Sequence, residues 1–220
     1  MGTHTTRARP AASANSRTTV AHSASLARTH ALGRALGAAL EPGDVILLVG
    51  DLGAGKTALA QGIGAGLGVR AVINSPTFTI LKEYAGRLPL YHFDLYRIES
   101  PDELYTLGFD EYFVGDGVCV VEWAERGEPT SPDAPLPWPV SYLRIELRAE
   151  GPERRTLTAT SAGPRGAALR AKASVLAVAT ATRTPLNEPG PSATATAVSV
   201  DIWTPCSRSS QRARSSVSEP

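Results

Sequence analysis

Residues 50–57 read Gly-Asp-Leu-Gly-Ala-Gly-Lys-Thr, a complete G-x-x-x-x-G-K-[ST] phosphate-binding loop. Its three glycines let the backbone turn its N–H groups toward phosphate oxygens at the positive end of a helix. We expect Lys56 to reach the β- and γ-phosphates of a nucleotide and the Thr57 hydroxyl to ligate Mg²⁺. The motif therefore predicts a nucleotide site. Its expected binding residues are Gly50, Asp51, Leu52, Gly53, Ala54, Gly55, Lys56, Thr57 and Ala58.

Two carboxylates follow segments that read as strands. Glu122 comes directly after the apolar run 118–121, and Asp94 lies near the end of the alternating segment 88–95. Because parallel strands end at the same edge of a sheet, we expect both side chains beside the phosphate loop. Hydrolysis of a nucleoside triphosphate needs Mg²⁺, a positioned water and cancellation of developing charge. We therefore predict Lys56, Asp94 and Glu122 as catalytic residues and Thr57, Glu122 and Asp94 as metal ligands. Which carboxylate is the direct ligand of Mg²⁺ stays open.

Two neighbouring patterns allow more than one interpretation. His92 and Asp94 lie two residues apart on an expected strand and so share a face, which allows an independent metal pair, although two ligands make a poor site. Ser75-Pro76-Thr77 follows the expected helix, where a switch segment is placed in nucleotide-hydrolysing proteins. Thr77 can contact the γ-phosphate there, or the segment can be a turn stiffened by proline.

The base and two further side chains are less constrained by the sequence. No N-K-x-D element, which reads guanine, occurs in the chain, so the expected base is adenine. Arg97 can cancel charge at the site or pair with Glu99 or Asp102. Trp123 can pack on the nucleotide or in the core, and the core is the default for tryptophan.

The segments around these residues predict an α/β fold, namely a three-layer P-loop NTPase with a mostly parallel sheet and antiparallel C-terminal strands. An apolar run precedes the loop at 45–49, and Leu59, Ile63 and Leu67 form one face of a helix after it. Further expected helices begin at Ser25, ending before Pro42-Gly43, and at the capping box 100–103. The other expected strands are 72–80 (interrupted by Asn-Ser-Pro), 88–95, 118–122, 143–147 and 156–160.

Composition divides the 220 residues into three parts. Residues 25–150 contain 10 basic and 17 acidic residues, so this acidic region is poorly suited to binding nucleic acid directly. We expect a disordered N-terminal extension over 1–24, an ATPase domain over 25–166 and a disordered low-complexity tail over 167–220.

The composition of the N-terminal extension also resembles that of an organellar transit peptide. Because the sequence has no hydrophobic leader and no long apolar stretch, we expect a cytoplasmic protein and no membrane contact. Neither Cys119 nor Cys206 has a zinc-site spacing.

Four segments in this order resemble the TsaE (YjeE) family of P-loop ATPases: 50–57, 75–78, 92–97 and 121–123. The resemblance covers about residues 25–165. It implies ATP hydrolysis in the formation of N6-threonylcarbamoyladenosine at position 37 of tRNAs that read codons beginning with A. It also implies TsaD- and TsaB-like partners, contact with tRNA only through the complex, and Thr29 near the adenine. Residues 175–182 weakly resemble the opening strand of TsaB, so a fusion or frameshift product is an alternative to a disordered tail.

Two other functions remain alternatives. A small-molecule P-loop kinase would use Asp94 and Arg97 for its acceptor, but the region 124–140 has one arginine and many prolines, unlike a mobile helical lid. A non-catalytic nucleotide-sensing adaptor would not need both Glu122 and Asp94. The expected cofactors are ATP and Mg²⁺.

Overall fold

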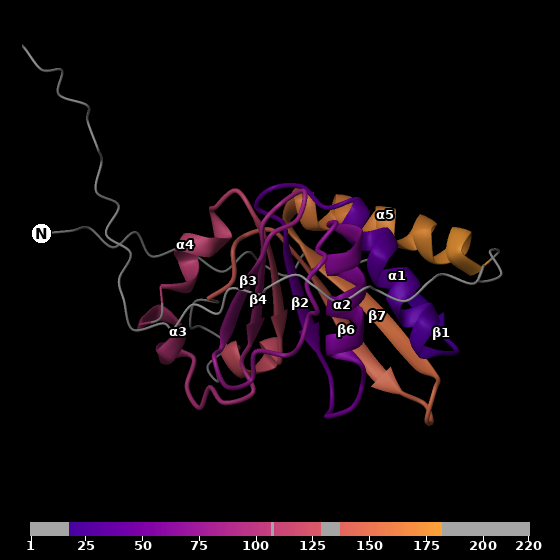
Figure 1. Ribbon diagram of the computed structural model, residues 1–220, viewed down its shortest axis with the longest axis horizontal. Coiled ribbons are helices and arrows are strands. Elements are labelled where there is room, and N and C mark those ends of the chain that lie inside the picture. Colours follow the sequence, from indigo (N-terminus) through magenta and orange to yellow (C-terminus); the bar gives the residue numbers. More distant parts are fainter. Residues whose placement is uncertain (1–17, 107, 129–136, 182–220) are drawn as a thin grey trace, which may run out of the picture.

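The computed structural model describes residues 18–106, 108–128 and 137–181, and the strands of these residues form one seven-stranded sheet (Figure 1). In chain order the elements are β1 Thr19–Ser23, α1 Leu26–Ala38, β2 Val45–Val49, α2 Lys56–Gly66, β3 Leu81–Tyr84, β4 Leu90–Asp94, α3 Asp102–Thr106, α4 Phe109–Phe113, β5 Val118–Glu122, the 3₁₀ helix η1 Ala124–Gly127, β6 Tyr142–Ala149, β7 Arg155–Ala162 and α5 Gly163–Ala181.

The sheet is parallel in its middle and antiparallel at both ends. Its strand order is β1-β7-β6-β2-β5-β4-β3, and the β6–β2, β2–β5 and β5–β4 pairs are parallel. The β1–β7, β7–β6 and β4–β3 pairs are antiparallel. The predicted mixed α/β fold with antiparallel C-terminal strands is therefore confirmed, and β3 adds an antiparallel strand that the sequence did not predict.

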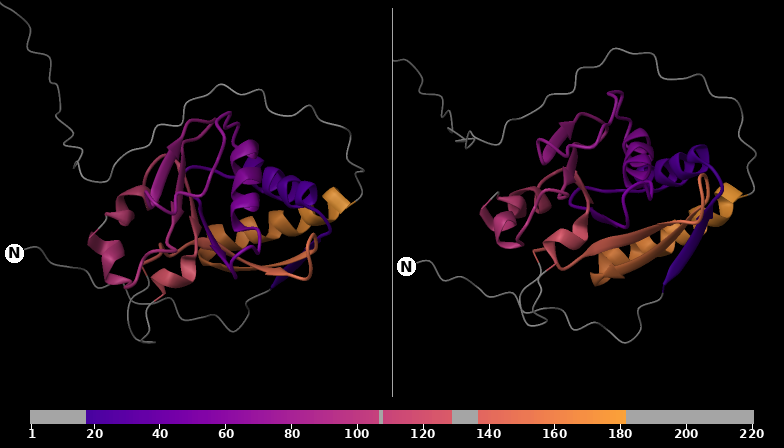
Figure 2. Two further views of the ribbon diagram at one scale, coloured as in Figure 1. Left: turned by 60° about the horizontal axis from the view of Figure 1, so that its bottom comes forward. Right: turned by 90° about the horizontal axis from the view of Figure 1, so that it is seen from below.

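Helices cover both faces of the central strands because those strands are apolar on both sides. All five residues of β2 are buried, as are all five of β5. Alternate residues of β2 enter two separate cores, Ile46 facing α1 and α2, and Leu47 facing the layer of α3, α4 and Trp138. Figure 2 shows α3 and α4 across the central strands from α1 and α2. The three-layer arrangement thus follows from the apolar runs of β2 and β5.

Helices α1 and α2 approach each other closely through glycines. A Cβ on Gly37 would lie 2.1 Å from the carbonyl oxygen of Ile63, and one on Gly62 would lie 2.5 Å from that of His30. Only residues without a side chain allow this separation of the two backbones. The predicted N-terminus of α1 is also confirmed, since the Ser25 side chain accepts a hydrogen bond from the Arg28 N–H at 3.1 Å.

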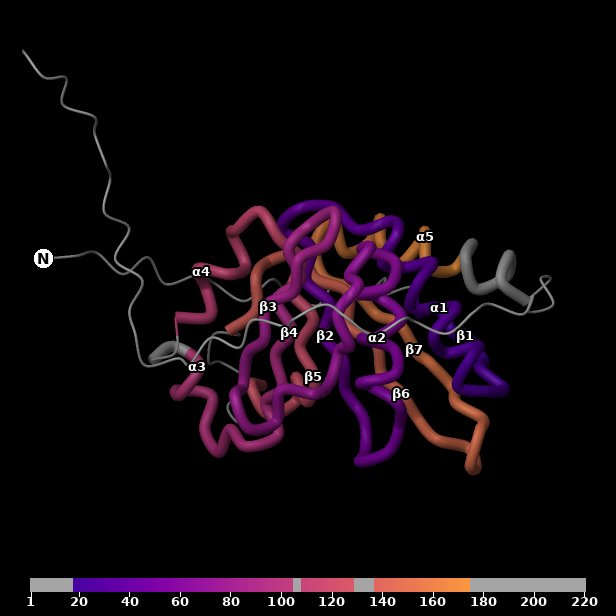
Figure 3. Tube along the Cα trace, viewed as in Figure 1, coloured from indigo at the N-terminus to yellow at the C-terminus, as the bar shows by residue number. Residues whose placement is uncertain are grey.

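The predicted domain limits are too narrow at both ends. Residues 19–23, expected to be disordered, form β1, which pairs with β7 from Thr19↔Ala159 to Ser23↔Arg155. Residues 167–181, also expected to be disordered, belong to α5, and its residues 175–181 are helical and not the strand of the fusion alternative. The coloured part of α5 in Figure 3 runs beside β1 and β7, so segments from opposite ends of the chain pack together. Residues 1–17 and 182–220 lie outside the described residues.

The segment 72–80 is the other correction. It is a loop and not a strand, with a turn closed by Ile80 N–H and Thr79 N–H donating to the Pro76 carbonyl at 2.7 and 2.9 Å. Proline and the hydroxyl-bearing residues before and after it favour such a turn over a sheet ladder. Among the described helices, none combines the length and the apolar character that crossing a membrane requires.

Candidate functional site

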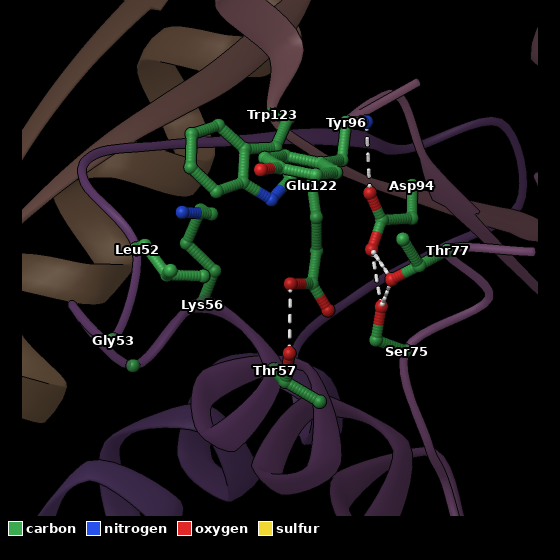
Figure 4. A pocket seen from close by; sticks show the side chains of 11 residues that line it. Leu52, Gly53, Lys56, Thr57, Ser75, Thr77, Asp94, Tyr96, Glu122 and Trp123 are labelled. Atoms are coloured by element: carbon green, nitrogen blue, oxygen red, sulfur yellow. Dashed lines mark hydrogen bonds between the residues drawn. The ribbon is translucent and has the colours of Figure 1, made fainter.

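A cavity of about 420 Å³ opens at the edge of the sheet where β4 and β5 end and the phosphate loop begins (Figure 4). The parallel register places Asp94 directly opposite Glu122, and Leu48, two residues before the loop, also opposite Glu122. The residues that line the cavity are Leu52, Gly53, Gly55, Lys56, Thr57, Ser75, Thr77, Asp94, Tyr96, Glu122 and Trp123. The structure therefore brings together the loop and both predicted carboxylates.

The phosphate loop has the backbone that its glycines predict. Gly50, Gly53 and Gly55 have φ angles of 133°, 77° and 102°, which favour glycine over other residues. Gly50 also has no room for a side chain, because a Cβ there would lie 2.2 Å from the Leu147 carbonyl oxygen. Gly55 is the N-cap of α2, so the helix N-terminus opens toward the cavity.

Lys56 is folded back onto this loop and covered by an indole ring. Its side chain is buried, and Nζ donates to the carbonyl oxygens of Gly50 at 2.5 Å and Asp51 at 3.0 Å. The Nζ atom lies 3.5 Å from the centroid of the Trp123 ring, so a cation–π contact covers its other side. Burial lowers the pKa of Lys56 below its usual value, while nearby carboxylates, first Glu125 and then Glu122, partly oppose this effect.

Thr57, Glu122 and His92 form one hydrogen-bonded chain. The Thr57 hydroxyl donates to Oε2 of Glu122 at 2.8 Å, and His92 Nε2 lies 2.8 Å from Oε1 of the same carboxylate. Both Glu122 and His92 are buried. A carboxylate and a hydroxyl are oxygen ligands of the kind Mg²⁺ prefers. This pair therefore fits the predicted metal site.

Asp94 enters the cavity but serves a different segment. Its Oδ2 accepts hydrogen bonds from the hydroxyls of Ser75 and of Thr77, the latter at 2.8 Å, and Oδ1 accepts from the Tyr96 N–H at 2.9 Å. Asp94 thus fixes the loop that carries Thr77. The loop ends at Ile80, whose φ of 64° is strained for a β-branched residue.

The remaining candidates from the sequence lie around the cavity in different ways. Thr29 does not line it: the hydroxyl of Thr29 is buried and hydrogen-bonds Ser23 Oγ at 2.8 Å at the start of α1. Four further predicted binding residues are not among the lining residues, namely Gly50, Asp51, Ala54 and Ala58, and Ala54 is buried within the loop itself.

Arg97 and Trp123 were each left with alternatives by the sequence. The Arg97 guanidinium lies 4.3 Å from the ring centroid of the exposed Phe78, outside the cavity lining. Trp123 lines the cavity and also packs, partly buried, against the second core, and its ring lies tilted against that of Tyr96 with 5.0 Å between the centroids. Its φ of 57° turns the chain directly after Glu122. Sequence periodicity could not reveal this turn.

The structure does not favour the independent His92–Asp94 metal pair, because His92 contacts Glu122 whereas Asp94 accepts from Ser75 and Thr77. Across the described ranges no group of three or more His, Cys, Asp or Glu residues is placed to hold a metal ion. Mg²⁺ at a nucleotide is usually held by one or two carboxylates together with phosphates and water, so this is consistent with a nucleotide-dependent site. Sequence reasoning missed the contact of His92 with Glu122. The register of β4 and β5 explains it, because Asp94 lies opposite Glu122 and His92 is two residues before Asp94 on the same face.

Comparison with known proteins gives concordant results. The profile of one family, "Threonylcarbamoyl adenosine biosynthesis protein TsaE", matches residues 23–157. The chain is 48% identical over 138 residues to the tRNA threonylcarbamoyladenosine biosynthesis protein TsaE of Bacillus subtilis, covering 62% of this chain and 82% of that protein. It is 42% identical over 154 residues to the Streptomyces coelicolor protein of the same name, covering 66% of this chain and 97% of that protein.

A solved structure resembles the fold as well. The crystal structure of Bacillus subtilis YdiB superimposes with a TM-score of 0.60 at 37% sequence identity. The superposition covers 74% of this chain and 98% of YdiB. The likeness therefore extends over nearly the whole of that protein.

Proposed function

The chain belongs to the TsaE family of threonylcarbamoyl adenosine biosynthesis proteins, and from this premise we propose that it is an Mg²⁺-dependent ATPase of that tRNA modification. Its relatives carry the name of tRNA threonylcarbamoyladenosine biosynthesis proteins. The proposed role is to hydrolyse ATP for the machinery that forms N6-threonylcarbamoyladenosine at position 37 of tRNA, in contact with TsaD- and TsaB-like proteins in the cytoplasm.

One observation carries the proposal of ATP hydrolysis. The hydroxyl of Thr57 at the N-terminus of α2 and the carboxylate of Glu122 at the end of β5 meet at 2.8 Å, inside the cavity that Lys56 also lines. These are the parts that a P-loop NTPase uses to hold Mg²⁺ and the phosphates. Bound Mg²⁺ supplies neutralisation of the charge that develops on the phosphoryl oxygens.

The protein groups then have distinct roles. The N–H groups at the start of α2 bind phosphate oxygens, and the Lys56 ammonium exchanges its carbonyl partners, Gly50 and Asp51, for the β- and γ-phosphates. Glu122 and Thr57 would hold the metal. Asp94 orders the segment that carries Thr77 at the γ-phosphate side of the cavity. Together these contacts place a water molecule and the triphosphate in a fixed arrangement before the bond breaks.

The acidic charge of residues 25–150 supports a role in a protein complex over direct binding to nucleic acid. In this proposal TsaD- and TsaB-like proteins contact the tRNA, and the ATPase acts on them.

Two measurements test the proposal. Purified protein should hydrolyse ATP in preference to GTP, with and without TsaD- and TsaB-like proteins, and EDTA should abolish the reaction. In cells depleted of their own TsaE protein, the wild-type chain should restore threonylcarbamoyladenosine in hydrolysed tRNA, measured by mass spectrometry, and Lys56→Ala should not. Restoration by a variant that hydrolyses no ATP would favour a nucleotide-sensing adaptor. A metabolite-dependent burst of ATP consumption would favour a kinase.

A further inference from the structure

Among the described residues, Glu122 is the hydrogen-bond partner of the His92 side chain. Its side chain is fully buried on β4, between β5 and β3, and it does not line the cavity. Its Nε2 atom lies 2.8 Å from Oε1 of Glu122, while the other oxygen of that carboxylate accepts from Thr57. The Glu122 carboxylate is therefore held from both sides, by a ring within the sheet and by a hydroxyl within the cavity.

The surroundings of the ring select one tautomer. Nδ1 of His92 is buried and has no hydrogen-bond partner among the described residues. A proton on Nδ1 would be a buried donor without an acceptor, and it would leave the Nε2 lone pair facing a carboxylate oxygen. With the proton on Nε2, the ring donates to Glu122 and leaves only an acceptor unpaired. The buried environment thus makes His92 a donor to this carboxylate.

The sheet fixes the backbone of Glu122 but not the orientation of its carboxylate. Glu122 ends β5 and is followed by Trp123, which has a left-handed backbone, so the main chain turns away at this point. The Glu122 side chain itself has rotatable bonds whose freedom these strands do not remove. The hydrogen bond from His92 is the contact that fixes the carboxylate on the side away from the cavity.

We propose that His92 is a positioning residue, whose Nε2–H orients the Glu122 carboxylate so that its second oxygen faces Thr57 and the Mg²⁺ site. This inference rests on the proposed function. Groups that hydrogen-bond a metal-ligating residue fix its orientation, and their loss typically costs about 10- to 100-fold in metal affinity or activity. His92 fills that role for Glu122 without touching the nucleotide.

The test uses three substitutions at His92 in the full chain, with one control. His92→Leu removes the donor and fills the space, His92→Asn has an amide too short to reach Glu122, and His92→Gln has an amide nitrogen near the position of Nε2. Phe93→Leu disturbs the neighbouring buried position of the same strand, which faces the other core. The readouts are kcat, KM for ATP, the Mg²⁺ concentration at half-maximal turnover, and the factor by which Mg²⁺ tightens ADP binding.

His92→Leu and His92→Asn should lower kcat about 10- to 100-fold and raise the Mg²⁺ midpoint about 10-fold, with KM for ATP at saturating Mg²⁺ nearly unchanged. His92→Gln should recover most of both losses, and Phe93→Leu should keep the wild-type Mg²⁺ midpoint. A His92→Leu enzyme with wild-type kcat and Mg²⁺ midpoint would overturn the proposal. So would equal damage in His92→Leu, His92→Gln and Phe93→Leu, which would indicate a packing role alone.

Two further readouts keep this test separate from the proposed function and from folding. If wild-type protein hydrolyses ATP no faster than Lys56→Ala, the ATPase proposal fails, and the effect of Mg²⁺ on ADP binding still decides the role of His92. If His92→Leu does not fold, the ¹⁵N shifts of the wild-type imidazole decide. A proton on Nε2 supports the proposal, and a proton on Nδ1 contradicts it.

Discussion

In the parallel part of the sheet, called the centre below, β4 and β5 each end in a carboxylate that lines the cavity. By contrast, β1, β7 and α5, called the flank below, contribute no side chain to the lining. The centre collects polar residues that hydrogen-bond one another, as Thr57, Glu122 and His92 do. The flank is held by apolar packing and by ion pairs such as Arg165 with the buried Asp44 at 2.7 Å. The two regions should therefore respond differently to substitution. Changes at the centre should lower ATP turnover, and changes at the flank should lower the free energy of unfolding.

The largest expected effect is at the centre. Lys56→Ala should reduce ATP turnover by about 10²- to 10³-fold, because the triphosphate loses its nearest fixed positive charge. The free energy of unfolding should change by no more than about 1 kcal/mol, since relief of the buried ammonium offsets the lost hydrogen bonds. Steady-state hydrolysis and a urea titration measure the two quantities. Undiminished turnover would exclude this loop as the active one.

The flank should respond in the opposite way. Leu169 of α5 is 1% exposed and packs in the core with α1, so Leu169→Ala should lower the free energy of unfolding by about 2–5 kcal/mol. Turnover below the melting temperature should be unchanged. Leu26→Ala is the matched control, because Leu26 is 61% exposed at the start of α1, and it should cost no more than about 0.5 kcal/mol. Loss of activity without loss of stability would show that α5 contributes to the site.

A smaller effect is expected where a loop caps a helix. Arg87 donates from Nη2 to the carbonyl oxygens of Gly37, Ala38 and Leu40 at the end of α1, whose last turn has no basic residue of its own. Arg87→Met keeps the aliphatic stem and should cost about 1–3 kcal/mol in unfolding free energy. Arg148→Met removes a guanidinium from a side chain that is 75% exposed and should be nearly neutral. Equal effects in the two variants would argue against capping by Arg87.

The smallest effect is expected from trimming the ends. Removal of 1–17 and 182–220 should leave ATP affinity and melting temperature unchanged, because neither sequence contributes a motif or a periodic core. Cuts at the predicted limits, 24 and 167, would instead remove β1 and most of α5 and should destabilise the flank. A loss of ATP affinity in the first truncation would show that these ends take part in binding.

The same contrast explains what could be predicted from the sequence. The centre is visible because buried parallel strands are unbroken apolar runs, and because the phosphate loop constrains its own surroundings. Strand β1 has only five residues with a half-buried pattern, and its partner β7 lies more than 130 residues away, so no local signal identifies it. The alanine-rich α5 similarly becomes helical through tertiary contacts such as Arg165 with Asp44.

Within the site, the sequence predicted which residues meet but not their partners. The ends of β4 and β5 placed Asp94 and Glu122 correctly at one cavity. Their hydrogen bonds depend on rotamers and on the turns at Ile80 and Trp123, both with positive φ, which no residue pattern specifies. For the same reason Thr29, expected near the adenine, could not be distinguished from a buried helix-start hydroxyl.

The roles of the two carboxylates are tested most directly by single-turnover hydrolysis at saturating Mg²⁺-ATP. Wild type, Glu122→Gln, Asp94→Asn and the double variant should be compared, with Glu128→Gln as a control at a surface carboxylate that pairs with Arg144. Each single site variant should be slower by on the order of 10²-fold with ATP binding largely retained, and the control should match the wild type. The double variant should be little worse than the slower single variant if the two carboxylates act as one unit. Rates near wild type for both Glu122→Gln and Asp94→Asn would contradict catalysis at this cavity.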